Sequence, residues 1–431
     1  MKVNIRKIII LSCLFIGILS VNAQWKPLEI SVDSWMFSDV FFLNKDTGYV
    51  AGHNQSGLIL KTTDGGLTWS DKSNGIVSNF LFAPFFVNVD TGYVAGLYGC
   101  FENYIFKTTD GGENWELQNT GIYNNNIIGV YFSSADSGFA MGTLGEFIQT
   151  TDGGTTWNLM QTNISDAKIY DVQFVNKDIM FAVGAELSSK GLILKSNDGG
   201  RNWEKATLPI KKDAVIQSIA SSNADTAYAV GFYWNNDTGL ILKTNDGGST
   251  WIEIKNRPVG IYNSVHFFNS TIGYIVGYDV ENDKAIIIAT KNGGESWDVQ
   301  QTSEEDGEYY DVFAIDEQIA YTVGRHGFGG QARVILKTTN GGNDPSQIIE
   351  SNIDNIYVYP NPFNDYISVY NPLFYSIQEL VIFDVFGKRI QILSAINQTQ
   401  VNIHLTHLNK GLYFVKIQTD KGISIHKLIK N

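Results

Sequence analysis

Cysteine is almost absent from this sequence of 431 residues, which contains only Cys13 and Cys100. Cys13 lies in an N-terminal stretch that we predict to be removed, so the mature chain would keep one cysteine and no intramolecular disulfide. The chain also lacks Cys and His at metal-ligand spacing, a His-Glu-x-x-His sequence and a Gly-rich phosphate loop. From these absences we expect the protein to bind neither a metal ion nor a cofactor.

Basic residues are in the minority, with 31 Lys and Arg against 44 Asp and Glu, which gives a formal net charge of −13. The first 23 residues and residues 353–431 are both basic, so the region between them carries a net charge of −18. Nucleic acids and anionic membrane surfaces attract basic patches. We therefore expect the protein to bind neither nucleic acids nor anionic membranes. We also expect it to be a monomer.

Residues 1–23 have the three parts of a secretory signal peptide. Lys2, Arg6 and Lys7 form a basic start, an apolar run covers Ile8–Ile18, and Val21-Asn22-Ala23 has the small-residue spacing of a cleavage site. The apolar run is too short for a confident membrane span. The sequence thus predicts export through the Sec pathway and a mature chain without a membrane span.

An eight-residue phrase, which reads TTDGGLTW at Thr62–Trp69, returns seven times. Its third residue recurs every 42 to 48 positions, at Asp64, Asp110, Asp152, Asp198, Asp246, Asn292 and Asn340. A second phrase, TGYVAG ending at Gly52, also has seven copies, and each repeat offers four short strand candidates. A period of this length with four strands is typical of a propeller blade. We predict an all-β chain in which residues 24–345 form a seven-bladed β-propeller.

The repeated phrase reads as a hairpin turn between the third and fourth strands of a blade. Gly-Gly supplies positive φ angles, and the Asp or Asn side chain can accept backbone hydrogen bonds inside the turn. This structural role is favoured over a metal or catalytic one. The seventh copy lacks its Trp, whereas Trp25–Ser31 resembles a fourth strand, so we expect the N-terminal segment to close the ring.

The chain changes character after the last repeat. Residues 346–355 read as a linker, and residues 356–431 contain six or seven short strand runs typical of a small β-sandwich. This tail closely resembles the C-terminal sorting domains of Bacteroidetes type IX secretion cargo. The resemblance rests on four motifs, namely Ile356–Pro372 with Pro360, Asn361 and Pro362, Leu380–Ile390 with Gly387, Leu408–Ile417 with Gly411, and Lys427–Lys430. It implies handling by the type IX machinery and a secreted or cell-surface protein.

The repeat region resembles the BNR/Asp-box propellers, and especially the seven-bladed group similar to photosystem II assembly factors. Related propellers include sialidases, xyloglucan-degrading glycosidases and non-enzymatic binding proteins, and the fold alone does not choose among them. A sialidase would need three Arg residues for its substrate and an Arg-Ile-Pro phrase. The phrase is absent, and the repeats contain no Arg before Arg201. An assembly factor remains a third possibility by analogy.

A glycoside hydrolase or lyase acting on polysaccharide is the main alternative to a binding protein. Asp39, Asp171 and Asp311 occupy one equivalent position in the first strands of three blades. First strands are innermost in a propeller, so these acids could converge on the central channel as a catalytic pair or a cation site. The simpler interpretation is that they are solvated or bonded within turns at the strand starts.

A binding role accounts for more of the sequence. The repeated turns share one face, so the opposite face carries the longer, variable loops, where function usually lies. Trp234 is the only tryptophan in a variable loop, and a recognition patch is predicted from Trp234, Tyr233, Tyr98, Tyr123, Tyr278, Arg325 and His326. We favour a non-catalytic propeller that recognises an extracellular protein or glycan.

Overall fold

The computed structural model describes residues 24–32, 36–54, 56–98, 102–121, 127–210, 213–302, 306–326, 332–342, 356–370, 376–384, 388–419 and 422–431. Every regular element within these ranges is a β-strand. No helix in the described part of the chain is long and apolar enough to cross a membrane. The predicted leader and linker lie outside the described residues. By its internal contacts the chain divides into two compact units, Met1–Asp344 and Pro345–Asn431.

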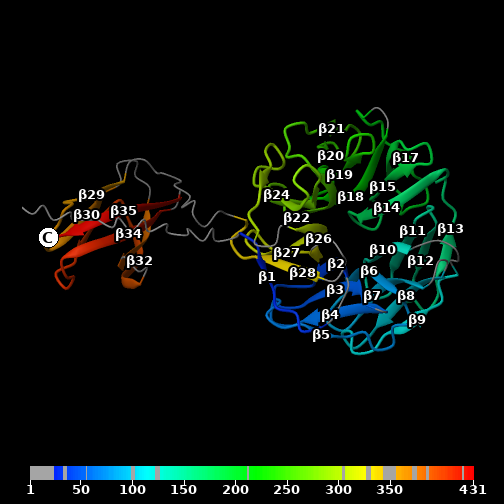
Figure 1. Cartoon of the computed structure of the whole chain (residues 1–431), viewed down its shortest axis with the longest axis horizontal. Coiled ribbons are helices and arrows are strands. Elements are labelled where there is room, and N and C mark those ends of the chain that lie inside the picture. Colours follow the sequence, from blue (N-terminus) through cyan, green and yellow to red (C-terminus); the bar gives the residue numbers. More distant parts are fainter. Residues whose placement is uncertain are drawn as a thin grey trace, which may run out of the picture. The chain divides into compact units, whose positions relative to one another are not determined.

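Seven four-stranded antiparallel sheets, the blades, form a ring in the first unit (Figure 1). Blades one to three are β2 (Met36–Phe42), β3 (Gly48–His53), β4 (Gly57–Thr62) and β5 (Ser70–Asp71); β6 (Phe80–Phe86), β7 (Gly92–Tyr98), β8 (Glu102–Thr108) and β9 (Glu116–Gln118); and β10 (Ile127–Phe132), β11 (Gly138–Gly142), β12 (Phe147–Thr150) and β13 (Asn158–Met160). Blades four to six are β14 (Ala167–Phe174), β15 (Met180–Glu186), β16 (Gly191–Ser196) and β17 (Glu204–Lys205); β18 (Ala214–Ser221), β19 (Ala227–Tyr233), β20 (Thr238–Thr244) and β21 (Ile252–Glu253); and β22 (Ile261–Phe267), β23 (Gly273–Asp279), β24 (Lys284–Thr290) and β25 (Asp298–Val299). Blade seven is β26 (Gly307–Ala314), β27 (Ala320–His326), β28 (Ala332–Thr338) and β1 (Lys26–Pro27). The predicted seven-bladed propeller is confirmed.

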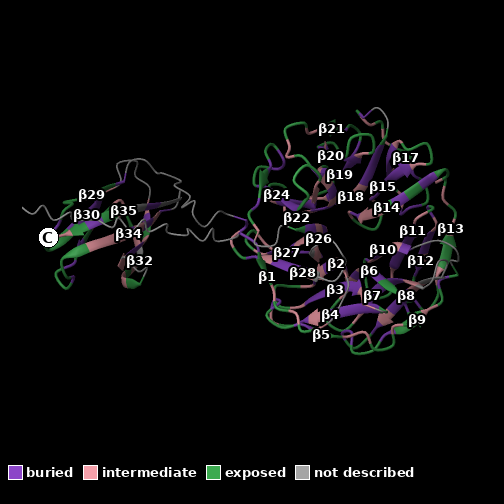
Figure 2. Cartoon of the chain, viewed as in Figure 1, coloured by how far each residue is buried: buried purple, intermediate pink, exposed green. Residues whose placement is uncertain are grey.

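The middle strands of each blade are buried on both faces, as the strands of Figure 2 show. In β3, for example, five of the six residues are buried. Each blade packs between two others, so these strands are continuous apolar runs rather than alternating ones. The core of the propeller is therefore a ring of inter-blade layers.

The N-terminal segment closes this ring. β1 pairs antiparallel with β28 as the outer strand of blade seven. Trp25 is fully buried and meets Tyr274 of blade six edge-on, with ring centroids 5.5 Å apart. The predicted closure is confirmed, but the strand covers Lys26–Pro27 rather than Trp25–Ser31. Pro27 has no N–H with which to extend the ladder.

The repeated phrase forms the hairpin between the third and fourth strands. In blade one, Asp64 Oδ1 accepts hydrogen bonds from Thr68 N at 2.9 Å and Thr62 Oγ1 at 2.8 Å. Gly65 and Gly66 have φ angles of +69° and +87°, which glycine adopts without a Cβ clash. The equivalent Thr or Ser hydroxyl donates to Asp110, Asp152, Asp198, Asp246, Asn292 and Asn340. These side chains thus hold the turn.

Neighbouring blades are joined by a Tyr and Lys pair that reaches the next turn. Tyr49 Oη and Lys61 Nζ both donate to the Gly111 carbonyl, at 3.0 and 2.7 Å. The Tyr49 ring also stacks on Phe86, with centroids 3.6 Å apart. The same arrangement joins three other pairs of blades through Tyr93 and Lys107, Tyr228 and Lys243, and Tyr321 and Lys337. The inter-blade contact is therefore polar as well as apolar.

The shared carbonyl gives a prediction about stability. Tyr49→Phe is expected to lower the free energy of unfolding by only about 1 kcal/mol, because Lys61 still donates to Gly111. Combining it with Lys61→Met should lower it by about 3 kcal/mol, more than the two single effects together, because the carbonyl then loses both donors. Urea denaturation of the three variants measures these values. A double variant as stable as either single variant would contradict the shared role.

The second unit consists of two sheets around one apolar core, which confirms the predicted β-sandwich. One sheet contains β29 (Tyr357–Tyr359), β30 (Tyr366–Tyr370) and β33 (Gln400–His404). The other has β32 (Arg389–Gln398), β31 (Ile377–Asp384), β34 (Gly411–Thr419) and β35 (Gly422–Lys430) in that order. Ile367 and Ile403 of the first sheet and Leu380 and Val415 of the second all belong to the core.

Asn361 fastens the segment between β29 and β30 to the last strand. Its Oδ1 accepts a hydrogen bond from Ile429 N at 2.9 Å, and its Nδ2 donates to Lys427 O at 2.6 Å. Of the other predicted motif residues, Pro360 and Pro362 flank Asn361, Gly411 begins β34, and Gly387 lies outside the described residues. The first and last sequence motifs of the tail therefore meet in space.

Candidate functional site

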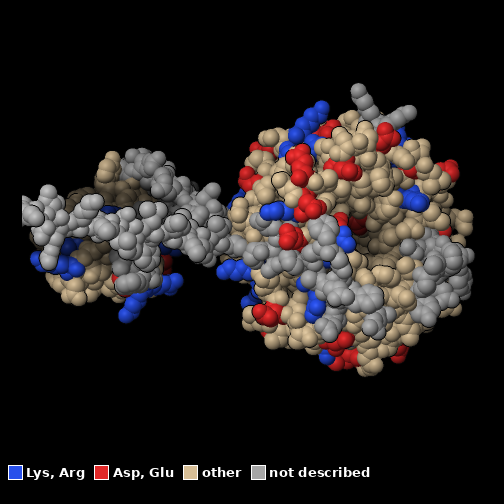
Figure 3. Space-filling view, in the orientation of Figure 1, with Lys and Arg blue, Asp and Glu red and all other residues tan. Residues whose placement is uncertain are grey.

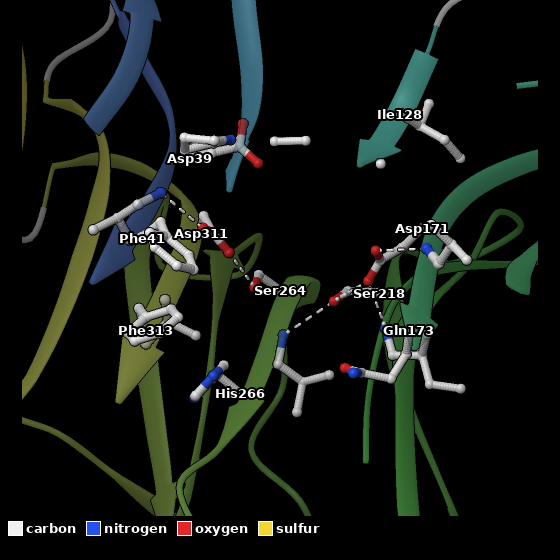
Figure 4. A pocket seen from close by; sticks show the side chains of 18 of the residues that line it. Asp39, Phe41, Ile128, Asp171, Gln173, Ser218, Ser264, His266, Asp311 and Phe313 are labelled. Carbon is white, nitrogen blue, oxygen red and sulfur yellow. Dashed lines mark hydrogen bonds between the residues drawn. The ribbon is translucent and has the colours of Figure 1, made fainter. Parts of the chain in front are cut away.

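The first strands of all seven blades line one pocket at the centre of the propeller, with a volume of about 270 Å³. Asp39, Asp171 and Asp311 line it, from β2, β14 and β26. Figure 4 shows their carboxyl groups around the pocket, with Ser218 and Ser264 between Asp311 and Asp171. The structure thus brings the three predicted channel acids together.

Asp311 joins three blades. Its Oδ2 accepts a hydrogen bond from Val40 N of blade one at 2.9 Å, and its Oδ1 accepts one from Ser264 Oγ of blade six at 2.7 Å. Asp171 Oδ2 accepts hydrogen bonds from Ile219 N and from Ser218 Oγ, both of blade five and both at 2.9 Å. Both carboxyl groups therefore act as acceptors that tie adjacent inner strands together.

Asp39 lacks the matching donor. The residue of blade two that corresponds to Val40 is Pro84, which has no N–H. Asp39 is bonded instead by Ser38 and by the Ala83 backbone. Ala83 has a φ of +52°, in the left-handed region that alanine seldom adopts. The contact that Asp39 makes between blades one and two thus differs from the contacts that Asp171 and Asp311 make.

Burial raises the pKa of all three carboxyl groups, because a charged form is poorly solvated in the pocket. The pKa of Asp39 rises to about 6, and that of Asp311 to about 7, where the charge of Asp39 adds to the effect of burial. These two acids can therefore hold a proton near neutral pH. Among the described residues, no group of three or more His, Cys, Asp or Glu side chains could hold a metal ion.

A tier of aromatic side chains, which the sequence analysis did not predict, lies next to the acids. Phe41 contacts Phe85 and Phe313, with centroids 5.7 and 5.6 Å apart, and Phe85 in turn lies 5.4 Å from Tyr131. His266 continues the tier on Phe313 at 4.5 Å, and burial lowers its pKa to about 4. All five residues occupy the same position in their blades, two residues after the position that Asp39 and Asp311 hold in theirs. Aligning the repeats could therefore have revealed them.

Trp234 stands on the hairpin between β19 and β20, at the opposite end of the blade from the repeated turn. Its side chain is 56% exposed, whereas the other tryptophans in the described part of the chain are buried or half-buried. Its backbone N–H donates to Asp213 O at 2.6 Å, and its ring meets Phe232 edge-on at 5.2 Å. Arg257 Nε donates to Gly239 O at 2.6 Å and so fixes the far side of the hairpin. The exposed indole is therefore held by an ordered loop.

The other predicted patch residues are spread over neighbouring hairpins of the same face. The Tyr278 hydroxyl is hydrogen-bonded to Asp283, which raises the pKa of Tyr278 to about 12. Arg325 pairs with Glu308 at 3.2 Å. Tyr233 is half-buried beside Trp234, and burial raises its pKa. Tyr123 and the side chains of Tyr98 and His326 lie outside the described residues. The described members thus belong to blades five, six and seven.

A second pocket, of about 460 Å³, lies at the edge of blade six. Its polar lining includes Asp279, Glu281, Asn282 and Lys284 of the hairpin between β23 and β24, and Val259 supplies apolar surface. No cavity was predicted there from the sequence. Acidic and basic side chains are interspersed with uncharged surface on the face of the propeller drawn in Figure 3.

Comparisons with known proteins agree with this architecture. Residues 19–121 and 155–260 match the family model of the photosynthesis system II assembly factor YCF48, and residues 357–431 match that of the secretion system C-terminal sorting domain. A comparison with curated protein sequences gives no match.

Solved structures share the propeller fold at low sequence identity. YCF48 bound to a D1 peptide is 14% identical, with 74% of this chain and 97% of that one covered and a TM-score of 0.57. YCF48 from Cyanidioschyzon merolae is 16% identical, with 75% of this chain and 99% of that one covered and the same TM-score of 0.57. A GH74 xyloglucanase from Xanthomonas campestris is 11% identical, with 81% of this chain and 59% of that one covered and a TM-score of 0.56. The chain therefore combines a propeller whose repeats match the YCF48 family with a secretion system C-terminal sorting domain.

Proposed function

We propose that the propeller recognises an extracellular protein or glycan, without catalysis, through the face that carries its variable loops. The sorting domain indicates export and a secreted or cell-surface location. An exported propeller meets its ligand outside the cell, where its acidic surface does not favour nucleic acid or anionic membranes. Export of the chain through the Sec pathway belongs to this proposal.

The exposed side chain of Trp234 is the observation that supports this function best. Large aromatic residues that are both exposed and held in place lose little conformational freedom on binding, and tryptophan is enriched among binding hot spots. The contact with Phe232 holds this side chain before any ligand arrives, and the backbone hydrogen bond to Asp213 holds the loop that carries it. Tyr278 and Arg325 belong to the next two blades, on the same face of the propeller.

A glycan and protein array probed with the purified propeller tests the proposal. Trp234→Ala is expected to weaken any specific hit by about tenfold or more, the typical effect of removing a hot spot. Leu67→Ala is the matched control, because Leu67 is 73% exposed but belongs to a repeated turn on the other face. Equal binding by parent and Trp234→Ala, or equal loss in both variants, would argue against the proposed face.

A glycoside hydrolase or lyase is the second candidate, supported by the raised pKa values of Asp39 and Asp311 in one pocket. Such enzymes need a proton donor and a second carboxylate about 5–9.5 Å apart in an open cleft. Here both oxygens of Asp311 accept hydrogen bonds from other blades. The pocket of about 270 Å³ is also smaller than most ligand sites. Release of sugars from polysaccharide by the parent, but not by Asp39→Asn, would favour the enzyme.

A further inference from the structure

The three-stranded sheet of the sorting domain presents a row of exposed tyrosines. Tyr357, Tyr359 and Tyr366 are 53%, 47% and 47% exposed. Tyr357 pairs with Tyr370 across β29 and β30, and Tyr366 pairs with His404 across β30 and β33, with ring centroids 6.1 Å apart. Alternation along the strands puts all five side chains on one side of the sheet. We call this surface the tyrosine face.

The fold of the domain uses the other side of the same sheet. Ile367, Val369 and Ile403 point into the apolar core, and Val358 and Val401 pack against it. The residues of the tyrosine face belong to neither group, so core packing does not explain why tyrosine stands there. Adjacent exposed aromatic residues commonly mark a surface that binds another protein.

The tyrosine face also lacks charge. The thirteen residues of β29, β30 and β33 include no Lys, Arg, Asp or Glu, whereas every strand of the opposite sheet contains at least one. Exposed sheet surfaces usually carry charged side chains, which oppose non-specific association. An uncharged aromatic surface has no electrostatic complementarity to the acidic propeller. It fits a partner surface that is itself apolar and uncharged.

We propose that the tyrosine face docks the sorting domain on an apolar, uncharged protein surface of the secretion apparatus. The family match to the sorting domain begins at Tyr357, the first residue of the face, so the face lies within the part of the chain that specifies sorting. Tyrosine suits such a contact because it buries a large ring while its hydroxyl keeps a hydrogen-bonding group at the rim. The contact would use side chains that do not take part in the core of the domain.

Secretion of the full chain by a bacterium with a type IX system provides the test. The triple variant Tyr357→Thr, Tyr359→Thr and Tyr366→Thr keeps residues that favour strands but removes the rings. The amount outside the cell is expected to fall by about tenfold or more, with the protein retained in the cell envelope. Ile392→Thr, at a 49% exposed position of the opposite sheet, should be secreted like the parent.

Resistance of the purified variants to protease shows whether the tail is still folded. If the triple variant proves unfolded, Tyr366→Thr alone takes its place, and the secreted amount of this variant is also expected to fall. Normal secretion of a folded tyrosine variant would overturn the proposal, as would an equal fall with Ile392→Thr. Normal secretion together with conversion of a parent dimer to a monomer, by size-exclusion chromatography, would assign the face to a second copy and overturn it too.

Discussion

Replacing Trp25 with alanine is expected to lower the free energy of unfolding of the propeller by about 3–5 kcal/mol, the range for truncating a large buried aromatic residue. Trp25 is fully buried and belongs to the apolar cluster between blades six and seven. The segment that carries it also supplies β1, the outer strand of blade seven. Its loss therefore leaves a cavity at the seam where the two ends of the propeller sequence meet.

Trp234→Ala is the matched control for this experiment, because it makes the same substitution at a 56% exposed position. Its effect on stability should stay within about 0.5 kcal/mol, as for other surface changes. Deletion of residues 24–31 should destabilise the propeller at least as much as Trp25→Ala. Equal urea midpoints for the parent and Trp25→Ala would show that the N-terminal segment does not hold the ring together.

Acidification from pH 8 to pH 5 is expected to stabilise the propeller by about 2 kcal/mol. Asp39 and Asp311 contribute about 4 kcal/mol and His266 opposes them by about 2 kcal/mol, since one pKa unit corresponds to about 1.4 kcal/mol. The pKa values of Asp39 and Asp311 in the folded chain, about 6 and 7, lie above the ordinary value of 3.8. The folded state thus binds protons more tightly than the unfolded state. This stabilisation is fully present below pH 3.8 and is lost as the pH rises through 6 to 7.

Asp311→Asn isolates this effect. The amide can still accept from Val40 N and can donate to Ser264 Oγ, but it cannot ionise. The variant should therefore lose much of the increase in stability between pH 8 and pH 5. His266 acts in the opposite direction in both proteins, because its pKa of about 4 in the folded chain lies below the ordinary value of 6.5, so the difference between the two slopes reports the contribution of Asp311. Thermal unfolding at a series of pH values measures the slope, and an unchanged slope in Asp311→Asn would show that this acid is not responsible.

The blade count could be predicted because every repeat carries its own turn signal. Gly-Gly after an Asp or Asn specifies the same hairpin wherever it occurs, independently of distant contacts. The site was harder to predict, because its geometry depends on registers between blades. A register shift between Phe37 and Asp39 in blade one helps to set where the Asp39 carboxyl group lies. Such irregularities have no clear sequence signature.

Sequence reasoning also treated side chains one at a time. Convergence of Asp39, Asp171 and Asp311 on the axis was one of two interpretations of the sequence, and the bonds of Asp311 to two other blades were not predicted. It missed the effect of Pro84, whose lost donor matters only when blade two lies beside blade one. The predicted aromatic patch depended on loop geometry, and the hairpins separate its described members over three blades.

Calorimetric titration of one ligand, chosen from the array, into three proteins tests the central claim most directly. The proteins are the parent, Trp234→Ala on the variable face and Asp311→Asn in the central pocket. Recognition by the variable face predicts binding at least about tenfold weaker for Trp234→Ala and unchanged for Asp311→Asn. Unchanged affinity of Trp234→Ala together with lost binding in Asp311→Asn would place recognition in the central pocket and contradict the account.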